Sequence, residues 1–599
     1  MFTSRKGEGT CPCVLPSDAC SCWGGLAVVS AVFACVLAFA AGGAKAANGV
    51  NLTGTPLTLT RIGKSTTVPT GVKLNQAFFT CSNDTDLPAS PNCPANSGGD
   101  DDSVVTTGSG APHVAGSALA GVTPSIPGLA NFNGVSDDDN KAVLGGHVTP
   151  PDQGLCVGPA GLLQNAGLPL AVSPWTSVIV EPVNEAWSVY STSGTKLFGP
   201  DSLADLFNDP YATGDVSCNY DPAARTFYFT EIGGLLSGPD AGNYGTDLAV
   251  ISPRGYAPYQ VDTSVSADCF PDFPQNGFDN NAFYLTINEF CGPDEDFAGA
   301  NLYGLSKTQL ASLSPSVNGV VFGPLVLNGD PVLSLRPAIG DGTSIEYLLN
   351  SVPYDASGNS TDSNTLGFWR VYGDAFLNNG GSPVRLFGMS TPSEPYAFPI
   401  PAASTGDGST PAGSPSYVIK EPYLNPDDSR LTQLQYHGGG SPRLYAALNS
   451  AMTIGNDPTV VDGAAWFEVD PYTGLVTRQG YVGVPGTNLL YPSIVHTSSW
   501  NTLMMGFSMT SPTLNPSTAY TISTNGGSSF GPVQTTGTGW GPHASFSDIL
   551  YDEPRWGDYS AIAFDPSNGN VWMADEYTVP VAIPPTIDNW GTRVWGLHP

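Results

Sequence analysis

The stretch RWGDYSAIAFDPSNGNVWMADEY (555–577) decides how we interpret the fold. Residues 559–564 read as a strand, residues 565–570 contain the turn-forming pairs Asp-Pro and Asn-Gly, and residues 571–574 read as a returning strand. Apolar runs separated by such turn residues are typical of a β-hairpin. We therefore predict a hairpin here, with aromatic residues on both arms.

The turn of this hairpin is not unique in the chain. An apolar residue, Asp-Pro, a few turn residues and an apolar strand recur at Asp221-Pro222, Asp470-Pro471 and Asp565-Pro566. A unit that recurs at distant places in one chain is typical of a repeat architecture. The pattern predicts a repeat protein built of β-hairpins.

The composition favours an all-β class. Charged residues make up only 12% of the 599 residues, and 71 Gly and 54 Pro are spread along the chain, so long charged surface helices are not expected. Val, Thr, Tyr, Phe and Trp occur in short runs bounded by Gly, Pro, Asn, Asp and Ser. Such runs predict short strands joined by many turns.

From about Lys141 onward, strand-like runs follow one another without a long amphipathic helix. The strand-rich region of about 450 residues is longer than an ordinary β-sandwich domain. An architecture that repeats four-stranded sheets around a central axis suits this length. We predict a single β-propeller at 136–599, after an irregular, partly disordered N-terminal region at 48–135. The predicted strands are 178–180, 187–190, 196–198, 226–230, 282–287, 346–349, 444–448, 465–469, 503–507, 519–522 and 591–597.

The charge balance limits the partners. The formal net charge is −32, from 52 Asp and Glu against 20 Lys and Arg. Such a chain repels phosphate backbones, so we expect no nucleic-acid partner. One hypothesis is adaptation to acid, because at low pH the carboxylates are protonated and few positive charges remain to repel one another. The alternative is an ordinary acidic secreted protein.

Residues 1–47 have the features of an export signal. Arg5 and Lys6 precede an apolar stretch at 26–41, and Ala44-Lys45-Ala46 is a small-x-small cleavage site. We expect a secreted or cell-envelope protein whose mature chain begins near Ala47. The apolar run of about 16 residues is short for a membrane span. An uncleaved N-terminal anchor is the alternative, and would be the one contact with a membrane.

Export favours disulfides, because cysteines in an oxidising compartment pair. Of the 11 cysteines, those within 1–47 would leave with the signal. We expect Cys81 to pair with Cys93 and Cys269 with Cys291, which leaves Cys156 with Cys218, although spacing alone does not fix the connectivity. A cysteine nucleophile is not expected.

Residues 523–530, STNGGSSF, look like the Asp-box of the sialidase superfamily, Ser-x-Asp-x-Gly-x-Thr-Trp. Ser523 and Gly527 match the pattern, while Asn525, Ser529 and Phe530 replace its Asp, Thr and Trp. The expected role is structural. The polar side chains would bond the turn amides, and the aromatic ring would pack between blades.

Five further segments carry a family resemblance: PPDQGLCVGP (150–159), DCFPDFPQNGFDNNAFYLTINEF (268–290), RLTQLQYHGG (430–439), YPSIVHTSSWNTLMMGFSMTS (491–511) and the stretch 555–577. In this order they are similar to a family of exported bacterial β-propeller proteins near the sialidase-like superfamily, over about 130–599. The resemblance implies six blades, or alternatively seven, and no settled activity. It also implies that an early segment, 142–148 or 51–62, completes the blade that contains 594–597.

The sialidase pattern suggests candidate catalytic residues. Sialidases use a Tyr nucleophile, and the family pattern adds a Glu partner, an Asp acid/base and three Arg that hold a substrate carboxylate. The candidates here are Arg555, Asp558, Tyr559, Glu576 and Arg593. In sialidases the sequence Phe-Arg-Ile-Pro marks the first of the three Arg residues. This chain has no convincing counterpart, and Leu335-Arg336-Pro337 resembles it only faintly.

A structural interpretation covers the same residues. Trp556 would pack between blades, Gly557 would allow close backbone approach, and Asp558 would cap a turn or pair with Arg555. Glu576 would then pair with Arg593 instead of acting on a substrate.

We expect no metal or cofactor, with Ca²⁺ as the alternative. Asp137-Asp138-Asp139 and Asp294-Glu295-Asp296 are carboxylate clusters, but neither has the spacing of a calcium loop, so each is interpreted as a solvated acidic turn. The histidines show no metal-ligand spacing. They are His113, His147, His437, His496, His543 and His598.

Three functions stay open. The first is a monomeric, non-catalytic module that binds an extracellular glycan, peptide or protein through loop aromatics such as Trp175, Trp500 and Trp540. The second is a sialidase-like glycoside hydrolase or lyase that uses carboxylates in the central funnel. The third is a structural cell-envelope protein held by its N-terminal segment.

Overall fold

The computed structural model describes most of the chain from Gly49 onward, and Gly49–Pro599 forms one compact unit. The predicted export signal, Cys81, Cys93, Asp294, Glu295 and Trp500 lie outside the described residues. The described residues are 49–73, 113–114, 122–124, 128–212, 214–236, 243–263, 269–292, 296–340, 342–354, 358–379, 383–412, 414, 418–497, 501–545, 554–580 and 588–598.

Consecutive strands pair antiparallel in groups of four, because short strands joined by tight turns lie beside their predecessors. Group 1 contains β6 (Cys156–Pro159), β7 (Ser177–Val183), β8 (Ala186–Ser191) and β9 (Lys196–Ser202). Group 2 contains β10 (Gly214–Asp221), β11 (Thr226–Gly234), β12 (Tyr244–Ser252) and β13 (Gly255–Val261). Group 3 contains β14 (Cys269–Phe278), β15 (Ala282–Cys291), β16 (Asp296–Ser306) and β17 (Ser316–Phe322).

The later groups repeat this order. Group 4 contains β20 (Arg336–Pro337), β21 (Glu346–Asn350), β22 (Ser363–Tyr372) and β23 (Arg385–Tyr396). Group 5 contains β27 (Leu431–His437), β28 (Arg443–Ile454), β29 (Val460–Val469) and β30 (Val476–Val482). Group 6 contains β31 (Asn488–Thr497), β32 (Thr502–Ser511), β33 (Leu514–Ser523) and β34 (Val533–Gly537). Group 7 contains β36 (Ala561–Phe564), β37 (Val571–Thr578), β38 (Trp590–Leu597) and β5 (Asn131–Ser136).

Short elements connect these groups. The helices are α3 (Asp137–Leu144), α4 (Ala160–Asn165), α5 (Leu203–Phe207), α6 (Lys307–Ala311) and the 3₁₀ helix η1 (Asp374–Asn379). The remaining strands are β1 (Val50–Thr53), β2 (Thr55–Arg61), β3 (His113–Val114), β4 (Val122–Pro124), β18 (Val326–Leu327), β19 (Asp330–Pro331), β24 (Ala402–Ala403), β25 (Ile419–Lys420), β26 (Tyr423–Leu424) and β35 (Ala544–Ser545). No described helix is long and apolar enough to cross a membrane.

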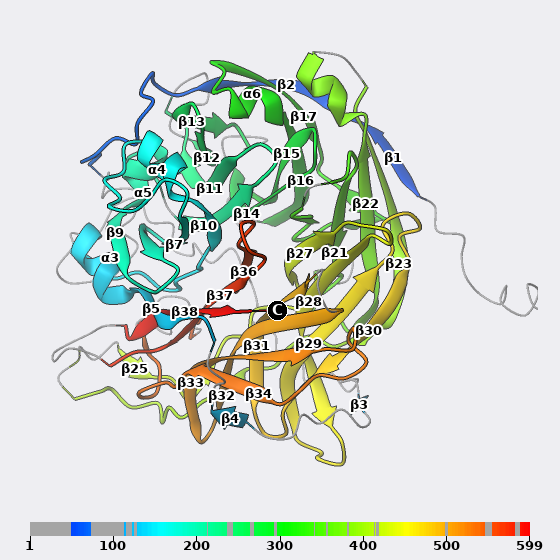
Figure 1. Cartoon of the computed structure of the whole chain (residues 1–599). Helices are drawn as coiled ribbons and strands as arrows, with labels where there is room; N and C mark the ends of the chain where they lie inside the picture. The colour runs from blue at the N-terminus through cyan, green and yellow to red at the C-terminus, as the bar shows by residue number, and fades with distance from the viewer. Residues whose placement is uncertain are drawn as a thin grey trace, which may run out of the picture. The chain divides into compact units, whose positions relative to one another are not determined.

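The seven groups form a ring, so the predicted β-propeller is confirmed and each group is a blade (Figure 1). Each blade contacts the next, and β6 of blade 1 contacts both β10 of blade 2 and β36 of blade 7. The first strand of each blade is the innermost. This grouping favours seven blades over six.

Ring closure differs from the prediction. The segment that completes blade 7 is β5, which pairs antiparallel with β38 through partners such as Asn131 and Trp595. The predicted closing segment 142–148 forms no strand: its first residues end helix α3, which begins at Asp137 because Ser136 caps a first turn that contains three Asp residues. The alternative closing segment, 51–62, does form strands, but these pair with other blades.

Residues 49–73, which we call the strap, run along the outside of the ring (Figure 1). Strand β1 pairs with β23 of blade 4, and β2 pairs with both β17 of blade 3 and β13 of blade 2. Farther along, Val68 and Val72 pack against the core of blades 1 and 2. The strap therefore ties four consecutive blades together.

The predicted Asp-Pro turns are present, and in each the Asp side chain accepts turn amides. Asp221 accepts from Ala223 N at 2.8 Å, Asp470 from Tyr472 N at 2.8 Å and Asp565 from Ser567 N at 2.9 Å. Two of these turns join the first and second strands of blades 2 and 7, whereas the Asp470 turn joins the third and fourth strands of blade 5. The turn is thus a repeated local device, not a fixed position of the blade.

The turn at 523–530 behaves as expected of a structural segment. Ser523 Oγ accepts from Gly527 N at 2.9 Å, and Asn525 Oδ1 accepts from Ser529 N at 3.0 Å. The Phe530 ring lies edge-on to Trp466 of blade 5, with ring centroids 6.0 Å apart. The polar side chains bond the turn amides and the ring packs between blades; kinship with the Asp-box stays a prediction.

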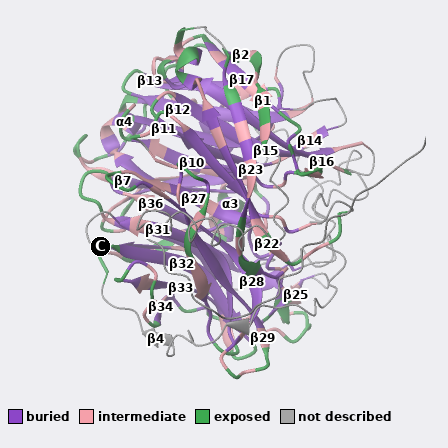
Figure 2. Cartoon of the chain, turned by 90° about the vertical axis from the view of Figure 1, so that its right-hand side faces the viewer, coloured by how far each residue is buried: buried purple, intermediate pink, exposed green. Residues whose placement is uncertain are grey.

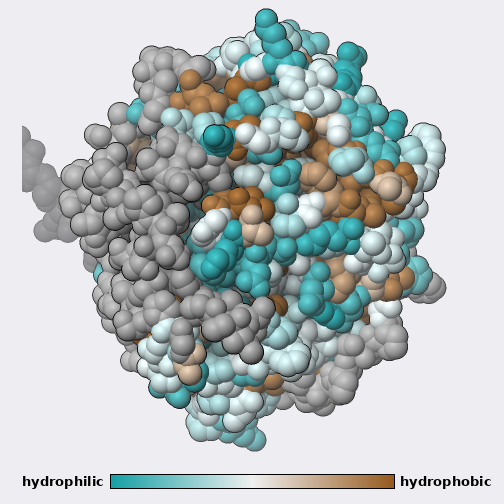
Figure 3. Space-filling model, turned by 90° about the vertical axis from the view of Figure 1, so that its left-hand side faces the viewer, coloured by the Kyte–Doolittle hydropathy of each residue, from teal (hydrophilic) through white to brown (hydrophobic). Residues whose placement is uncertain are grey.

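The strands of the blades are largely buried and the loops carry most of the exposed residues (Figure 2). On the face shown in Figure 3, hydrophobic residues form separate patches among hydrophilic ones. Two predicted disulfides are confirmed: Cys156–Cys218 joins β6 to β10, and Cys269–Cys291 joins β14 to β15. Both indicate an oxidising environment.

Candidate active site at the start of the inner strands

The first strands of the blades run in one direction around the channel. Isolated bridges from Phe278 to Ile339 and from Ile339 to Gln435 are parallel, as expected for neighbouring inner strands. We call the end of the ring where the first strands begin the front end, and the end where they finish the back end. The loop from one blade to the next therefore reaches the channel at the front end.

Strained backbone marks the front end. Six non-glycine residues near the start of first strands have positive φ angles, which cost on the order of 1–3 kcal/mol each and cluster at functional sites. They are Asp152 (43°), Asp215 (55°), Phe273 (57°), Ser334 (46°), Asp427 (58°) and Tyr491 (52°). This recurrence is a structural repeat of the ring.

Asparagine side chains hold three of these residues in place. Asp215 N donates to Asn184 Oδ1 at 2.7 Å, Ser334 N to Asn288 Oδ1 at 2.8 Å and Tyr491 N to Asn449 Oδ1 at 2.8 Å. Each Asn lies in or directly after the second strand of the preceding blade. One amide therefore connects each of these blades to the inner strand of the next.

Three carboxylates meet at the front end. Oxygens of Asp152, Asp215 and Asp558 lie within 4.8 Å of one another. Asp152 Oδ1 accepts from Asp558 N at 2.9 Å, and Asp215 Oδ2 accepts from Phe273 N at 3.1 Å. Asp152 and Asp215 thus accept hydrogen bonds from backbone amides of other blades and also belong to the acidic cluster.

The close approach of these carboxylates disfavours their ionised forms. Burial, Asp558 and Asp215 raise the pKa of Asp152 well above its ordinary value, although Arg555 and Asn184 oppose the shift. Burial and Asp558 likewise raise the pKa of Asp215 to about 6. Carboxylates with raised pKa values can accept and donate protons near neutral pH.

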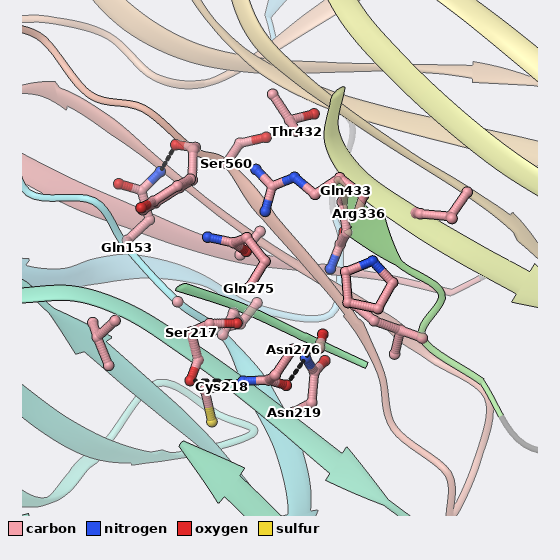
Figure 4. Close-up of a pocket in the computed structure, with 18 residues that line it drawn as sticks. Gln153, Ser217, Cys218, Asn219, Gln275, Asn276, Arg336, Thr432, Gln433 and Ser560 are labelled. Atoms are coloured by element: carbon pink, nitrogen blue, oxygen red, sulfur yellow. Dashed lines mark hydrogen bonds between the residues drawn. The ribbon is translucent and has the colours of Figure 1, made fainter. Parts of the chain in front are cut away.

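A cavity of about 40 Å³ lies beside this cluster, along the channel. Ligand pockets usually have roughly 300–1,000 Å³, so this cavity accommodates one small group. Polar side chains from several inner strands face it, among them Gln153, Asn219, Asn276 and Arg336 (Figure 4). The cavity suits a polar or charged group.

Tyr559 and Arg336 line the cavity, and the charge of Asp215 acts on both. The Tyr559 hydroxyl is buried and faces the carboxylate of Asp215, with which it interacts as a hydrogen-bond donor. Burial, followed by Asp215 and Asp152, raises its pKa well above the ordinary value. The Arg336 guanidinium stacks on Phe273 at 4.2 Å, and its Nη2 has no partner among the described residues. Burial lowers the pKa of Arg336 to about 9.

The structure brings together four of the five predicted catalytic candidates. Arg555 Nη2 and Asp558 Oδ2 form an ion pair of 2.7 Å, and Tyr559 follows directly. Glu576 lies under Gly557, where an added Cβ would be 2.5 Å from Glu576 Oε1. Trp556 is buried and donates to Ser508 Oγ at 3.2 Å. The expected structural contacts of Trp556, Gly557 and Asp558 are therefore present.

The predicted ion pair between Glu576 and Arg593 is wrong. Glu576 lies opposite Thr592 in the sheet, and the Arg593 guanidinium bonds to Asn131 and Asn133 of the outermost strand. The difference arises because successive residues of a strand point to opposite faces. Arg593 consequently lies away from the acidic cluster.

The aromatic binding candidates do not form one platform. Trp175 is 80% exposed and Trp540 is 71% exposed. Trp175 directly precedes the second strand of blade 1, at the back end, whereas Trp540 N donates to Thr578 O at the front end. A single ligand at either mouth would contact only one of them.

Of the two acidic clusters considered for Ca²⁺, only Asp137–Asp139 lies wholly within the described residues. Asp137–Asp139 make the first turn of α3, where Asp137 is buried and bonds to His147 at 2.6 Å, so the solvated-turn interpretation is wrong for it. In the second cluster Asp296 begins β16. The oxygens of Asp152, Asp215 and Asp558 are of the type that Ca²⁺ prefers. A second group of possible metal ligands consists of Cys269, Glu289 and Cys291, but its two sulfurs are bonded to each other in a disulfide.

The sequence contains a signal for two cluster residues that are not among the predicted candidates. Asp152-Gln153-Gly154, Asp215-Val216-Ser217 and Asp558-Tyr559-Ser560 are Asp-x-small triplets, and each lies where an inner strand starts. The same triplet also occurs at Asp462-Gly463-Ala464 and Asp565-Pro566-Ser567, so it becomes specific only once the start of each inner strand is known. The position of Arg336 in the cavity has no comparable signal, because its own triplet is Ser334-Leu335-Arg336.

No protein-family model and no curated protein matches the sequence. A Hadza microbial sialidase matches with 10% identity and a TM-score of 0.34, over 72% of this chain and 74% of its own. The Trypanosoma rangeli sialidase matches with 8% identity and a TM-score of 0.29, over 64% and 55%. An endo-arabinase from Bacteroides thetaiotaomicron matches with 10% identity and a TM-score of 0.26, over 64% and 93%. At these values the similarity carries no argument about activity.

Proposed function

We propose that the protein is a glycoside hydrolase with Tyr559 as its nucleophile. One observation carries the proposal: a buried Tyr hydroxyl that faces Asp215, a carboxylate able to take its proton, lines a cavity beside three clustered carboxylates. Glycosidases with a Tyr nucleophile are an established exception to the two-carboxylate scheme.

The neighbouring groups can supply the proton transfers. The Tyr559 oxygen would attack the anomeric carbon while its proton passes to a carboxylate of the cluster. The bond to the leaving group would break as a carboxylic acid of the cluster donates its proton, and water would then release the sugar from Tyr559. The raised pKa values of Asp152 and Asp215 support both roles.

The substrate class follows from Arg336. Its guanidinium lines the cavity, and no carboxylate of the described residues lies within ion-pair distance of it. Asp427 and Asp215 act on this guanidinium only from beyond ion-pair distance, and a buried cation without a carboxylate in direct contact favours an anionic ligand group. A glycan that bears a carboxylate fits, with that group in the small cavity and the rest of the glycan outside it.

The test is turnover of a panel of neutral and carboxylate-bearing glycosides by the full chain. Tyr559→Phe and Asp558→Asn should each lower turnover by at least about a hundredfold. Tyr577→Phe is the matched control, because its hydroxyl bonds to Asn133 on the outermost strand at 2.8 Å. Absence of turnover in the folded parent, or turnover that survives Tyr559→Phe, would contradict the proposal.

A non-catalytic glycan-binding module is the second candidate. The exposed Trp540 ring at the front end favours it, since sugars stack on such rings. Binding of a glycan by the parent without turnover, weakened by Trp540→Ala and unchanged by Tyr559→Phe, would support this function instead. Export is part of both proposals, and the disulfides and the signal predicted at 1–47 support it.

A further inference from the structure

Two histidines meet at the back end of the channel. His437 is the last residue of β27 in blade 5, and His496 is the next-to-last residue of β31 in blade 6. Both side chains are partly exposed. The inner strands of two neighbouring blades thus bring together residues far apart in the sequence.

The spacing of the two rings suits one bound ion. Their centroids are 4.4 Å apart and their planes are inclined by 56°. Imidazole nitrogens bind Zn²⁺ at roughly 2.0–2.1 Å, so two rings on one ion have centroids roughly 4.5–5.5 Å apart. A shift of a few tenths of an ångström would bring both rings into range.

Nitrogen lone pairs are available on both rings. The His437 ring makes no hydrogen bond in the part of the chain that the structure describes. Asn501 interacts with the His496 ring as a hydrogen-bond partner, whereas His496 Nδ1 is buried without a described partner. Burial lowers the pKa of His437, and burial together with His437 lowers the pKa of His496 to about 4. A neutral imidazole is the form that binds metals.

The surroundings orient the pair. The ring of Tyr445 stacks on His496 at 5.1 Å with an interplanar angle of 11°. Glu468 accepts from the Tyr445 hydroxyl at 3.0 Å and is paired with Arg478 and Arg443 at 2.7 Å and 3.2 Å. Its carboxylate is thus satisfied and is not needed as a ligand. The remaining coordination positions would be taken by water.

We propose that His437 and His496 bind a divalent transition-metal ion, Zn²⁺ or a related borderline ion, between blades 5 and 6. Imidazole ligands suit Zn²⁺, Cu²⁺ and Ni²⁺, whereas Ca²⁺ and Mg²⁺ prefer oxygen. The ion joins the ends of two inner strands at the back end. This site is independent of the hydrolytic site at the front end.

The test is calorimetric titration of the full chain with Zn²⁺, after alkylation of free thiols so that cysteines outside the disulfides do not contribute. We expect one site in the parent, and at least tenfold weaker binding in His437→Gln and in His496→Gln. His598→Gln is the matched control, since His598 is exposed and bonds to Asn570 at 2.7 Å. The control should bind like the parent.

A second measurement needs no substitution. The paramagnetic resonance spectrum of one equivalent of Cu²⁺ should show two nitrogen ligands. Zn²⁺ should also raise the midpoint of thermal unfolding in the parent and control, but not in the two variants. No binding by the parent, binding by both variants that is as tight as that of the parent, or a copper spectrum with fewer than two nitrogens would overturn the proposal.

Discussion

Gly557 lies where the loop into blade 7 crosses a buried carboxyl group. A Cβ at this position would be 2.5 Å from Glu576 Oε1, and burial raises the pKa of Glu576 well above its ordinary value. Gly557→Ala should therefore destabilise the protein by about 1–3 kcal/mol, because the core must shift to admit one methyl group. Urea unfolding measures the loss.

The control for this substitution is Gly541→Ala. Gly541 has nothing within 4 Å of an added Cβ, and its backbone φ is not in the left-handed region. Its free energy of unfolding should change by less than about 0.5 kcal/mol. Equal effects of the two substitutions would show that close approach at Gly557 does not constrain the loop.

Residue-level prediction succeeded where the chemistry was local. Arg555 and Asp558 are only three positions apart, so their ion pair could be predicted from the sequence. The error at Glu576 has a simple cause: which face of β37 it occupies depends on the register with β38, and a shift of one residue reverses every side chain. Arg336 could not be placed because its cavity exists only when several blades meet.

At the scale of elements, the strap is the segment whose role sequence alone did not reveal. Leu59 of β2 is buried among residues of blades 2 and 3, while its neighbour Thr58 is exposed. Leu59→Ala should cost about 2–5 kcal/mol through lost burial and a residual cavity. Thr58→Ala, on the outer face of the same strand, should cost less than about 0.5 kcal/mol.

Urea unfolding of both variants checks this prediction. If the strap were only a loosely attached tail, Leu59→Ala would be as mild as Thr58→Ala. The strands themselves were predictable, since residues 51–62 alternate; their partners were not. Strand β2 pairs with β17 and β13, about 200 or more residues away, and no local pattern specifies such partners.

The same limit applies to ring closure. An early segment was correctly expected beside the last strand, but β5 takes that place and Asp137–Asp139 start a helix. The capping signal at Ser136 was present in the sequence and competes with strand formation. The all-β class and the repeated hairpins could be predicted from the turns at Asp221, Asp470 and Asp565, because these side chains stabilise turns through neighbouring amides.

For the whole molecule, the buried carboxyl groups predict how stability varies with pH. Burial raises the pKa of Glu181 to about 7, and those of Asp462 and Asp575 to about 8. In the unfolded chain these groups titrate near roughly 4. Their neutral forms are favoured by folding, so their contribution to stability is complete below about pH 4 and is lost as pH rises through 7 to 8.

Two histidines oppose this trend. Burial lowers the pKa of His543 to about 3 and that of His496 to about 4, so their contributions are present above about pH 6.5 and are lost as pH falls. The carboxyl groups are more numerous, and each contributes on the order of 3 kcal/mol across its window. The net expectation is a protein that is more stable at pH 5 than at pH 8.

Urea unfolding at the two pH values tests this expectation and with it the hypothesis of adaptation to acid. The midpoint should be higher at pH 5, and Asp462→Asn should reduce the difference, because Asn cannot ionise while its oxygen can still accept from Ile400 N as Asp462 does at 2.9 Å. Equal midpoints, or a midpoint that is higher at pH 8, would contradict the prediction. Loss of the folded structure near pH 3 would remove the hypothesis of adaptation to acid, because protonated carboxyls and only 20 Lys and Arg leave little repulsion to drive unfolding.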